Sequence, residues 1–267
     1  MSADLIRVER DRTETTIATV TLNRPDKLNA LTKPMWQRLG DVMRELSADD
    51  GLRCVVLRGA TSAAGRKAFA PGNDIAEFET ERSNFAQGKA YGEMLHGALG
   101  AIADCRHPTV ALIEGVCVGG GLEIAALCDL RICGESSRFG VPINRLGLVM
   151  AHAELAALVQ LAGRAVALEM LLEGRVFGAQ EALAKRLVHR VVADDEVERE
   201  AWATARRIAA GAPLAARWHK QFLRELAPVV PLSEAQRDEG FRCYDSEDFG
   251  IGVRAFLAKA EPQFVGR

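Results

Sequence analysis

Two glycine-containing turns are the residues best placed to do chemistry in this sequence. The first is in AFAPGNDI (68–75), where a strand leads into Pro71-Gly72, and the second is in VGGGLEIAALCD (118–129), where three glycines open a helix. Amide N–H groups at a helix N-terminus have no intrahelical partner, and glycine lets a ligand approach them closely. Each turn could therefore present a backbone donor to a ligand oxygen.

Taken together, the two turns could form an oxyanion hole. Two amides from separate loops would stabilise negative charge on a thioester oxygen, and one such donor contributes about 3 kcal/mol. The alternative is that both are ordinary tight turns, because a single glycine-rich turn is a weak signal. The spacing matches neither the GxGxxG dinucleotide fingerprint nor a P-loop, and no GxSxG motif indicates a serine hydrolase.

Glu123 follows the second turn on a helix whose neighbouring residues, Leu122 and 124–127, are apolar. A carboxylate in this setting lies either on the one polar stripe of its helix or in the protein interior. In the interior it must be paired, or it must have a raised pKa that suits proton transfer. Glu123 is therefore the leading candidate for a catalytic carboxylate.

The elements that must position these residues alternate between strand and helix. We expect strands at 5–8, 15–22, 54–57, 109–113, 130–133 and 138–139, and helices at 34–46, 85–104 and 119–128. From residue 153 the chain is expected to be mostly helical, with one extended stretch at 187–192. This order predicts an α/β domain with parallel strands followed by a helical extension.

The predicted boundary between these two parts lies near residue 193. Residues 1–193 would form the core that carries the site, and residues 194–267 would form amphipathic helices. Those helices need an apolar surface to cover, and it could belong to the chain's own core or to a partner subunit.

Composition favours a globular protein of the cytoplasm. Of the 267 residues, 48% are apolar and 26% are charged, and the net charge of −2 gives no reason to expect nucleic acid or an anionic membrane as a partner. The charged start of the chain lacks the apolar region of a secretory signal, and the apolar runs are too short to span a bilayer. The six cysteines are scattered without CxxC spacing, so we expect reduced thiols and no metal centre.

Several segments resemble the crotonase superfamily, the enoyl-CoA hydratase/isomerase family. They are NRPDKLNAL (23–31), FAPGND (69–74), VCVGGGLEIAALCDLRIC (116–133), FGVPINRLGL (139–148), the stretch 161–192 and AFLAKAEPQF (255–264). The resemblance extends over almost the whole chain. It implies an α/β, crotonase-like (ClpP/crotonase) spiral of repeated ββα units, with a C-terminal helical trimerisation region at 194–267. It also implies assembly into a homotrimer or a dimer of trimers.

The resemblance further implies an acyl-CoA site. Asn73 and Gly120 would supply the oxyanion-hole amides, and Glu123 matches the first catalytic glutamate of the hydratases. The CoA moiety and the acyl group would contact residues in both turns and upstream of them, namely Lys27, Leu28, Ala68, Ala70, Asn73, Asp74, Ile75, Ala76, Gly120 and Ile143. No cofactor is implied beyond the coenzyme A of the substrate, and no metal.

The chain departs from the family pattern at two places. Ile143 stands where the second catalytic glutamate of the hydratases is expected, and an isoleucine cannot transfer a proton. Directly afterwards, Met150-Ala151-His152-Ala153-Glu154 replaces a glycine-rich segment, which would bring His152 and Glu154 near the acyl group. Either side chain could take over the missing role, although Glu154 could instead serve as a charge at a helix N-terminus.

Hydration of a 2-enoyl-CoA is the reaction that we expect, because Glu123 occupies a hydratase position. Hydration needs one group to activate water and another to deliver a proton to the α-carbon. A Δ3-Δ2-enoyl-CoA isomerase, or other enolate chemistry, could work with a single carboxylate and is the first alternative. The second alternative is a catalytically silent CoA-binding scaffold, for which Ile143 is the main support.

Overall fold

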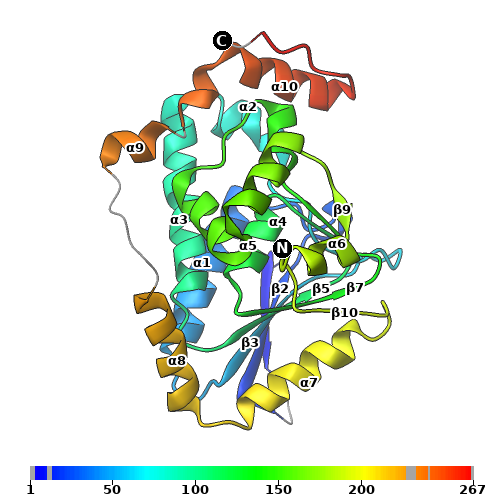
Figure 1. Cartoon of the computed structure of the whole chain (residues 1–267), viewed down its shortest axis with the longest axis vertical. Helices are drawn as coiled ribbons and strands as arrows, with labels where there is room; N and C mark the ends of the chain where they lie inside the picture. Colours follow the sequence, from blue (N-terminus) through cyan, green and yellow to red (C-terminus); the bar gives the residue numbers. More distant parts are fainter. Residues whose placement is uncertain (1–3, 11–13, 227–232, 240, 266–267) are drawn as a thin grey trace.

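Two β-sheets form the centre of the molecule. The computed structural model describes residues 4–10, 14–226, 233–239 and 241–265 (Figure 1). The larger sheet has the order β1 (Ile6–Arg10), β2 (Ile17–Leu22), β3 (Cys54–Gly59), β5 (Thr109–Ile113), β7 (Leu130–Gly134) and β10 (Arg190–Val192). The smaller sheet has the order β4 (Ala68–Ala70), β6 (Val116–Val118), β8 (Arg138–Gly140) and β9 (Phe177–Gly178). The β1–β2 and β8–β9 pairs are antiparallel, and the other pairs are parallel.

The chain moves between the two sheets in a repeated ββα pattern. The strand pairs β3–β4, β5–β6 and β7–β8 each place one strand in the large sheet and the next in the small sheet. A helix follows each pair: α3 (Phe85–Ala103), α4 (Gly120–Leu127) and α5 (His152–Glu173). The predicted spiral of ββα units is therefore confirmed. The two-residue β9 and three-residue β6 were not expected from the sequence, because they are too short to show a periodic pattern.

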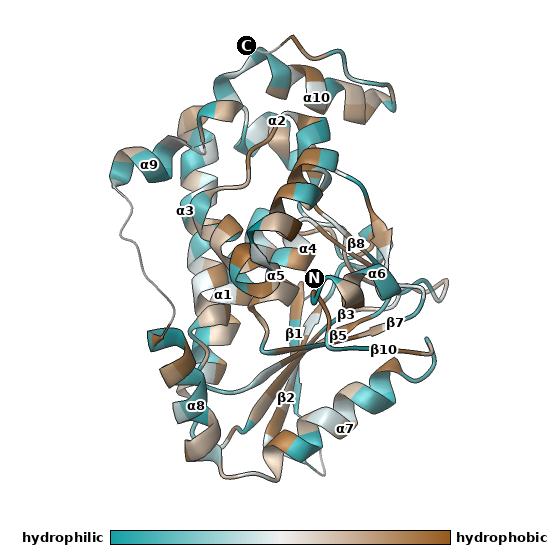
Figure 2. Ribbon diagram, in the orientation of Figure 1, coloured by the Kyte–Doolittle hydropathy of each residue, from teal (hydrophilic) through white to brown (hydrophobic). Residues whose placement is uncertain are grey.

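One large apolar core lies between the sheets and the helices. In α1 (Lys33–Ala48), the buried side chains recur at helical spacing and include Met35, Trp36, Leu39, Val42 and Met43. This face packs on α3 and on the strands, which Figure 2 shows as largely hydrophobic. Burial of each such side chain contributes about 1.5–3 kcal/mol, so α1 is fixed firmly under the site.

The first helix of the C-terminal region covers the chain's own sheet. On α7 (Val197–Ala209) the residues Val197, Ala201, Ala205 and Ala209 form one buried face. They pack against Ile17, Cys54, Val56, Val110, Leu112 and Ile132 of the large sheet. Of the two surfaces considered for the C-terminal helices, α7 therefore uses the chain's own core (Figure 1).

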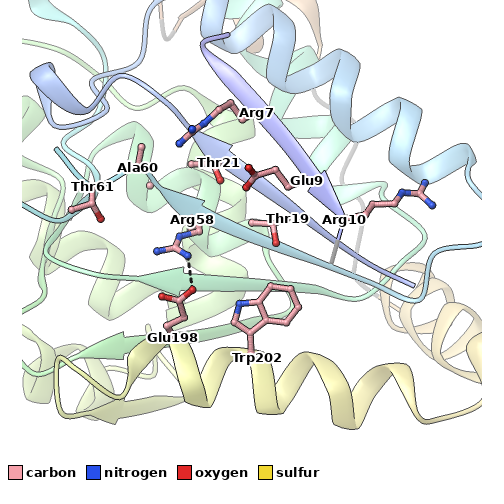
Figure 3. A pocket seen from close by; sticks show the side chains of 11 residues that line it. Arg7, Glu9, Arg10, Thr19, Thr21, Arg58, Ala60, Thr61, Glu198 and Trp202 are labelled. Carbon is pink, nitrogen blue, oxygen red and sulfur yellow. Dashed lines mark hydrogen bonds and ion pairs between the residues drawn. The ribbon is translucent and has the colours of Figure 1, made fainter. Parts of the chain in front are cut away.

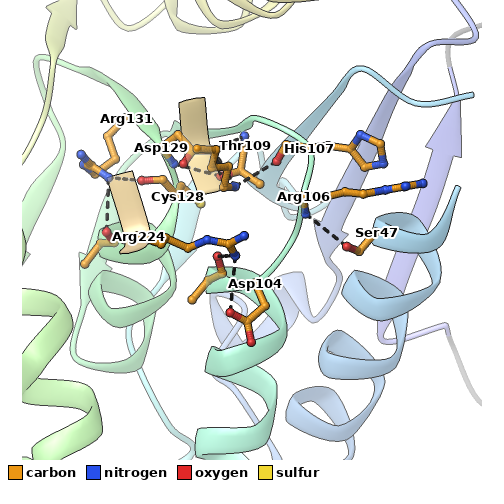
Figure 4. Close-up of polar contacts among 12 residues, drawn as sticks. Ser47, Asp104, Arg106, His107, Thr109, Cys128, Asp129, Arg131 and Arg224 are labelled. Carbon is orange, nitrogen blue, oxygen red and sulfur yellow. Dashed lines mark hydrogen bonds and ion pairs between the residues drawn. The ribbon is translucent and has the colours of Figure 1, made fainter. Parts of the chain in front are cut away.

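The second C-terminal helix, α8 (Pro213–Glu225), is attached through its polar side. Arg217 donates to the Leu52 carbonyl, and Lys220 pairs with Asp129 at 2.7 Å. Arg224 reaches Asp104 (Figure 4). Its apolar side chains remain in solvent, with relative exposures from 52% at Phe222 to 79% at neighbouring Leu226. The helix thus presents an uncovered apolar face.

The last helices pack at the opposite end of the molecule. They are α9 (Glu234–Glu239), η4 (Arg242–Asp245) and α10 (Glu247–Ala258). The first, α9, lies beside α3, where Asp238 pairs with Lys89, whereas α10 lies near α2 (Phe78–Glu81) and η3 (Pro142–Leu146) (Figure 1). A small apolar cluster joins η4 and α10 to α2 and η3, made of Phe78, Leu146, Ala151, Phe241, Tyr244, Phe249 and Val253. Two further elements, η1 (Pro25–Lys27) and α6 (Ala179–Ala184), are connectors. The ends of the two predicted parts, residues 1–3 and 266–267, lie outside the described residues.

By length and composition alone, one described helix, α5, could cross a membrane. Its backbone is not continuous, however, because Gly163 has φ 83° and ψ 161°, outside the helical region. Each half is about eleven residues long, whereas a span needs about twenty. In the folded chain α5 packs against α4 and η3 instead.

Candidate active site

The two glycine turns meet in space although 47 positions separate Gly72 from Gly119 in the chain. A Cβ atom built on Gly72 would lie 3.3 Å from the Gly120 nitrogen, and one built on Gly119 would lie 3.7 Å from the Gly72 Cα. Gly72 has φ 105° and Gly119 has φ 51°, conformations that glycine adopts without strain. The close contact therefore depends on both glycines.

A cavity of about 510 Å³ opens at this contact. Its walls include the predicted site residues Asn73, Asp74, Ile75, Ala76, Gly120, Glu123, Ile143 and Glu154. Among the described residues, no backbone or side-chain acceptor is bonded to the amide nitrogen of Asn73 or to that of Gly120. The side chain of Asn73 is held, because its Oδ1 accepts a hydrogen bond from Trp36 Nε1 at 2.6 Å.

The first turn is stabilised by hydrogen bonds to the segment before α1. Leu31 N–H donates to the Gly72 carbonyl at 2.8 Å, and Asp74 N–H donates to the Leu31 carbonyl at 2.8 Å. The Asp74 carboxylate also accepts from Arg24 at 2.7 Å and from the Ala76 N–H at 3.1 Å, which caps η2 (Ile75–Glu77). These bonds fix the backbone on both sides of Asn73.

Glu123 is buried, which decides between the two positions considered for it. Only 9% of the residue is exposed, and its Oε2 has no hydrogen-bond partner among the described residues. Burial raises the pKa of Glu123 well above its usual range, the Glu154 carboxylate raises it further, and Arg82 lowers it. The raised pKa favours the protonated form of Glu123, which can act as a proton donor.

Glu154 is the second carboxyl group in the cavity. Its Oε1 lies 2.9 Å from His96 Nε2, and its Oε2 accepts from the Ala151 N–H at 3.1 Å, which caps the N-terminus of α5. The two roles considered for Glu154 are thus compatible, since one side chain caps the helix and lines the cavity. His152, the other auxiliary candidate, is exposed on the first turn of α5 and is absent from the cavity lining.

The remaining predicted contact residues are found at different depths. Ile143 lines the cavity with an apolar side chain. Lys27 ends η1 and is exposed, and Leu28, which follows it, is half-buried, whereas Ala68 and Ala70 are buried in β4 directly before the first turn. None of these four lines the cavity.

Two arginines of the cavity wall were not found from the sequence. Arg82 ends α2 and is only 8% exposed, whereas Arg145 of η3 is exposed. In the sequence, Arg82 lies in the polar run ETERSN (79–84), which is typical of a solvated loop. The C-terminal helix α10 also contributes to the wall through Phe256 and Leu257, so the predicted extension reaches the site.

A second hollow, of about 540 Å³, lies between the β1–β3 edge of the large sheet and α7 (Figure 3). Its side chains are mostly polar, and its one drawn ion pair joins Arg58 to Glu198 at 2.9 Å. It contains no paired carboxyl groups like those of the glycine-turn cavity. We therefore place the candidate active site in that cavity.

The structure offers no metal centre within the described residues, where no group of three or more His, Cys, Asp or Glu side chains could hold an ion. None of the six cysteines forms a disulfide within the described residues, and burial raises the pKa of the Cys54 thiol to about 12. These thiols are packing groups rather than nucleophiles.

Comparison with known proteins gives the same assignment as the fold and the cavity. The model of the enoyl-CoA hydratase/isomerase family matches residues 12–267. A Mycobacterium bovis protein named as a probable enoyl-CoA hydratase is 33% identical over 270 residues, covering all of both chains. A solved structure described as an enoyl-CoA hydratase/carnitine racemase from Magnetospirillum magneticum is 52% identical, with a TM-score of 0.81 over 100% of this chain and 97% of that one. A methylmalonyl-CoA decarboxylase in complex with 2-nitronate-propionyl-CoA is 29% identical, with a TM-score of 0.86 over 100% of both chains.

The two-sheet spiral and the family match thus define an enzyme of the crotonase class. The chain belongs to the enoyl-CoA hydratase/isomerase family. The resemblance found in the sequence is confirmed, and with it the interpretation of the chain as an acyl-CoA-processing enzyme of that family.

Proposed function

We propose that this enzyme hydrates a 2-enoyl-CoA, with Asn73 and Gly120 as oxyanion-hole donors and Glu123 and Glu154 as the acid–base pair. The observation that carries the proposal is the presence of two carboxyl groups, in contrasting environments, on the wall of one cavity beside two unbonded amides. Pairs of carboxyl groups whose surroundings separate their protonation states are typical of acid–base catalysis.

The environments of the two groups suggest their roles. Glu123 is buried without a partner at Oε2, and its raised pKa favours the neutral acid that can protonate C2. Glu154 is held by His96 and by the Ala151 N–H, an arrangement that suits a carboxylate that accepts a proton from water. Water would add at C3 and a proton at C2, so the net reaction consumes one water.

The oxyanion hole would stabilise the enolate formed as water adds. The amides of Asn73 and Gly120 come from turns that the Gly72–Gly120 contact holds together. Because protein donors held in place need no reorganisation, loss of one costs about 100- to 1,000-fold in rate.

Glutamine variants of the two carboxyl groups test the proposal. Glu123→Gln and Glu154→Gln should each lower kcat for hydration of crotonyl-CoA by about 100- to 10,000-fold, the usual contribution of an acid–base group. Glu173→Gln is the matched control, because Glu173 lies on the same helix as Glu154 but is exposed and away from the cavity. Unchanged hydration by Glu154→Gln would refute the two-carboxylate mechanism.

Isomerisation of a 3-enoyl-CoA is the second candidate, and the apolar Ile143 in the cavity wall favours it. An isomerase needs one group to move a proton between carbons, and Glu123 could do this alone. Assay of a 3-enoyl-CoA distinguishes the two reactions. Isomerase activity that survives in Glu154→Gln while hydration is absent would favour isomerisation, and no turnover of any enoyl-CoA would favour a silent scaffold.

We also propose that the chain assembles as a homotrimer or a dimer of trimers through its C-terminal helices. The support is the exposed apolar face of α8, formed by Leu214, Trp218, Phe222, Leu223 and Leu226. Burial of such a face contributes about 25 cal/mol per Å², which favours a second copy over solvent.

A further inference from the structure

Arg82 is a buried cation on the wall of the active-site cavity. The side chain belongs to a residue that is 8% exposed, and it lines the same cavity as Glu123 and Glu154. Among the described residues it forms no ion pair with a carboxylate. A buried guanidinium without a counter-charge is costly and is seldom kept without a reason.

Three aromatic rings hold the guanidinium in place. Its central carbon lies 4.5 Å from the centroid of the Phe78 ring, 4.6 Å from that of Tyr91 and 5.1 Å from that of Tyr244. The Arg82 Nη2 donates to the Tyr244 hydroxyl. These contacts come from three separate parts of the chain, so the orientation of the guanidinium is fixed before any ligand binds.

Two of the guanidinium nitrogens remain without a bond. Arg82 Nε and Nη1 are buried and have no hydrogen-bond partner among the described residues. The nearby carboxyl groups do not satisfy them, since Glu154 is bonded to His96 and to the Ala151 N–H, and Glu123 Oε2 is itself unbonded. Each of these two N–H groups can donate a charge-assisted hydrogen bond to a carboxylate oxygen.

We propose that the acyl group of the natural substrate carries a second, free carboxylate, which binds Arg82 on the wall of the cavity. The substrate class would be the CoA monothioester of a short unsaturated dicarboxylic acid. This inference rests on the proposed acyl-CoA site and names the acyl group that the site selects. A cationic acyl terminus would be repelled by the same arginine.

Such a ligand would also assist the proposed chemistry. The positive charge of Arg82 lowers the pKa of Glu123 in the empty site, against the effect of burial. A bound carboxylate would offset that charge and favour the protonated form of Glu123. Binding of the correct acyl group would therefore prepare the acid for proton transfer to C2.

Binding of saturated acyl-CoA pairs tests the inference without requiring turnover. Calorimetry would compare succinyl-, glutaryl- and adipyl-CoA with the matching thioesters in which the distal carboxylate is a carboxamide. The wild-type enzyme should bind at least one acid more tightly than its amide by about tenfold or more, as a charge-assisted pair does. Equal affinity for acid and amide in all three pairs would overturn the proposal.

Variants assign the preference to Arg82. Arg82→Met should remove the preference for acid over amide, whereas Arg82→Lys should retain part of it, because the charge remains. Arg145→Met is the matched control, since Arg145 also lines the cavity but is exposed, and the preference should persist in it. Loss of the preference in Arg145→Met with its retention in Arg82→Met would overturn the assignment. A thermal melt would show whether Arg82→Met folds, and if it does not, Arg82→Lys takes its place. Loss of the preference for acid over amide in both Arg82→Lys and Arg145→Met would then overturn the assignment to Arg82.

The test of the Arg82 site and the test of the hydratase activity can fail independently of each other. Equal binding of acids and amides, together with hydration of crotonyl-CoA, would leave the hydratase proposal intact. A clear acid preference with no turnover of any enoyl-CoA would support the Arg82 site and refute hydration.

Discussion

Replacing Glu123 with glutamine should stabilise the fold while abolishing activity, and the gain should grow with pH. The pKa of Glu123 is raised mainly by burial, so the folded chain holds its proton more tightly than the unfolded chain, whose value is near 4.5. Below about pH 4.5 the carboxyl of Glu123 is protonated in both states, so its ionisation does not change the free energy of unfolding. As the pH rises further, the unfolded chain ionises and the folded chain does not, which disfavours folding by about 1.4 kcal/mol per pH unit until the folded-state pKa is reached.

The glutamine variant lacks this penalty, so its stability relative to wild type should increase over the same window. For each pH unit between 4.5 and the folded-state pKa the difference should grow by about 1.4 kcal/mol, which corresponds to about 3–5 °C in melting temperature for a chain of this size. Urea or thermal unfolding of both proteins from pH 4 to 9 measures it. Subtracting the free energy of unfolding of wild type from that of the variant at each pH removes the contribution of the groups that the two proteins share.

Glu114→Gln is the matched control for this experiment. Glu114 is also buried, but it pairs with Lys67 at 2.5 Å and with Arg58 at 3.6 Å. Removing this charge should destabilise the fold by about 1 kcal/mol, because Lys67 is about half exposed and water can solvate it once the pair is lost. The reasoning would be refuted if Glu123→Gln were less stable than wild type at pH 8, or if its stability difference did not change with pH.

Three further predictions follow from the packing. Gly72→Ala should lower kcat by about 100-fold or more, because its Cβ would lie 3.3 Å from the Gly120 nitrogen at φ 105°, and unaltered kinetics on crotonyl-CoA would contradict this. Trp218→Glu should reduce the oligomer to smaller species in sedimentation analysis, since Trp218 is 53% exposed on the apolar face of α8; an unchanged mass would exclude that face as the interface. The pKa of His107 is lowered to about 4, first by burial and then by Arg217 and Arg106, so the contribution of His107 to stability should fall by about 2 kcal/mol between pH 7 and pH 5. His107→Gln should show less of that loss in urea unfolding, and an identical loss would show that His107 is not its source.

Much of the fold could be predicted from sequence because its signals are local. The helix at 34–46 shows apolar residues at helical spacing, and the strands at 54–57 and 109–113 are continuous apolar runs. The division of the strands between two sheets could not be predicted in this way, because β4, β6 and β8 have only three residues each. Their pairing is decided by contacts between segments far apart in the chain.

The site residues also differ in whether a local motif or a distant contact identifies them. The glycine turns and Glu123 could be found because a motif of adjacent residues carries them. Glu154 could be proposed from its position but not assigned, since its partner His96 is 58 residues away on α3. Arg82 could not be found, because its burial depends on Tyr244, 162 residues further along the chain.

The α8 helix shows a third kind of limit. Its amphipathic pattern predicts that its apolar face is covered, yet within one chain its basic side chains make the contacts with the core. The sequence alone could not indicate which of the two faces would meet the chain's own surface. The hydrogen bonds of Arg217, Lys220 and Arg224 to groups of the core decide which face meets it.

A crystal structure with 3-hydroxybutyryl-CoA bound would test the two-amide, two-carboxyl arrangement most directly. The thioester oxygen should lie about 2.7–3.1 Å from the nitrogens of both Asn73 and Gly120. The C3 hydroxyl should lie between Glu123 and Glu154. A thioester oxygen out of reach of both nitrogens, or a hydroxyl in contact with neither carboxyl group, would contradict the account.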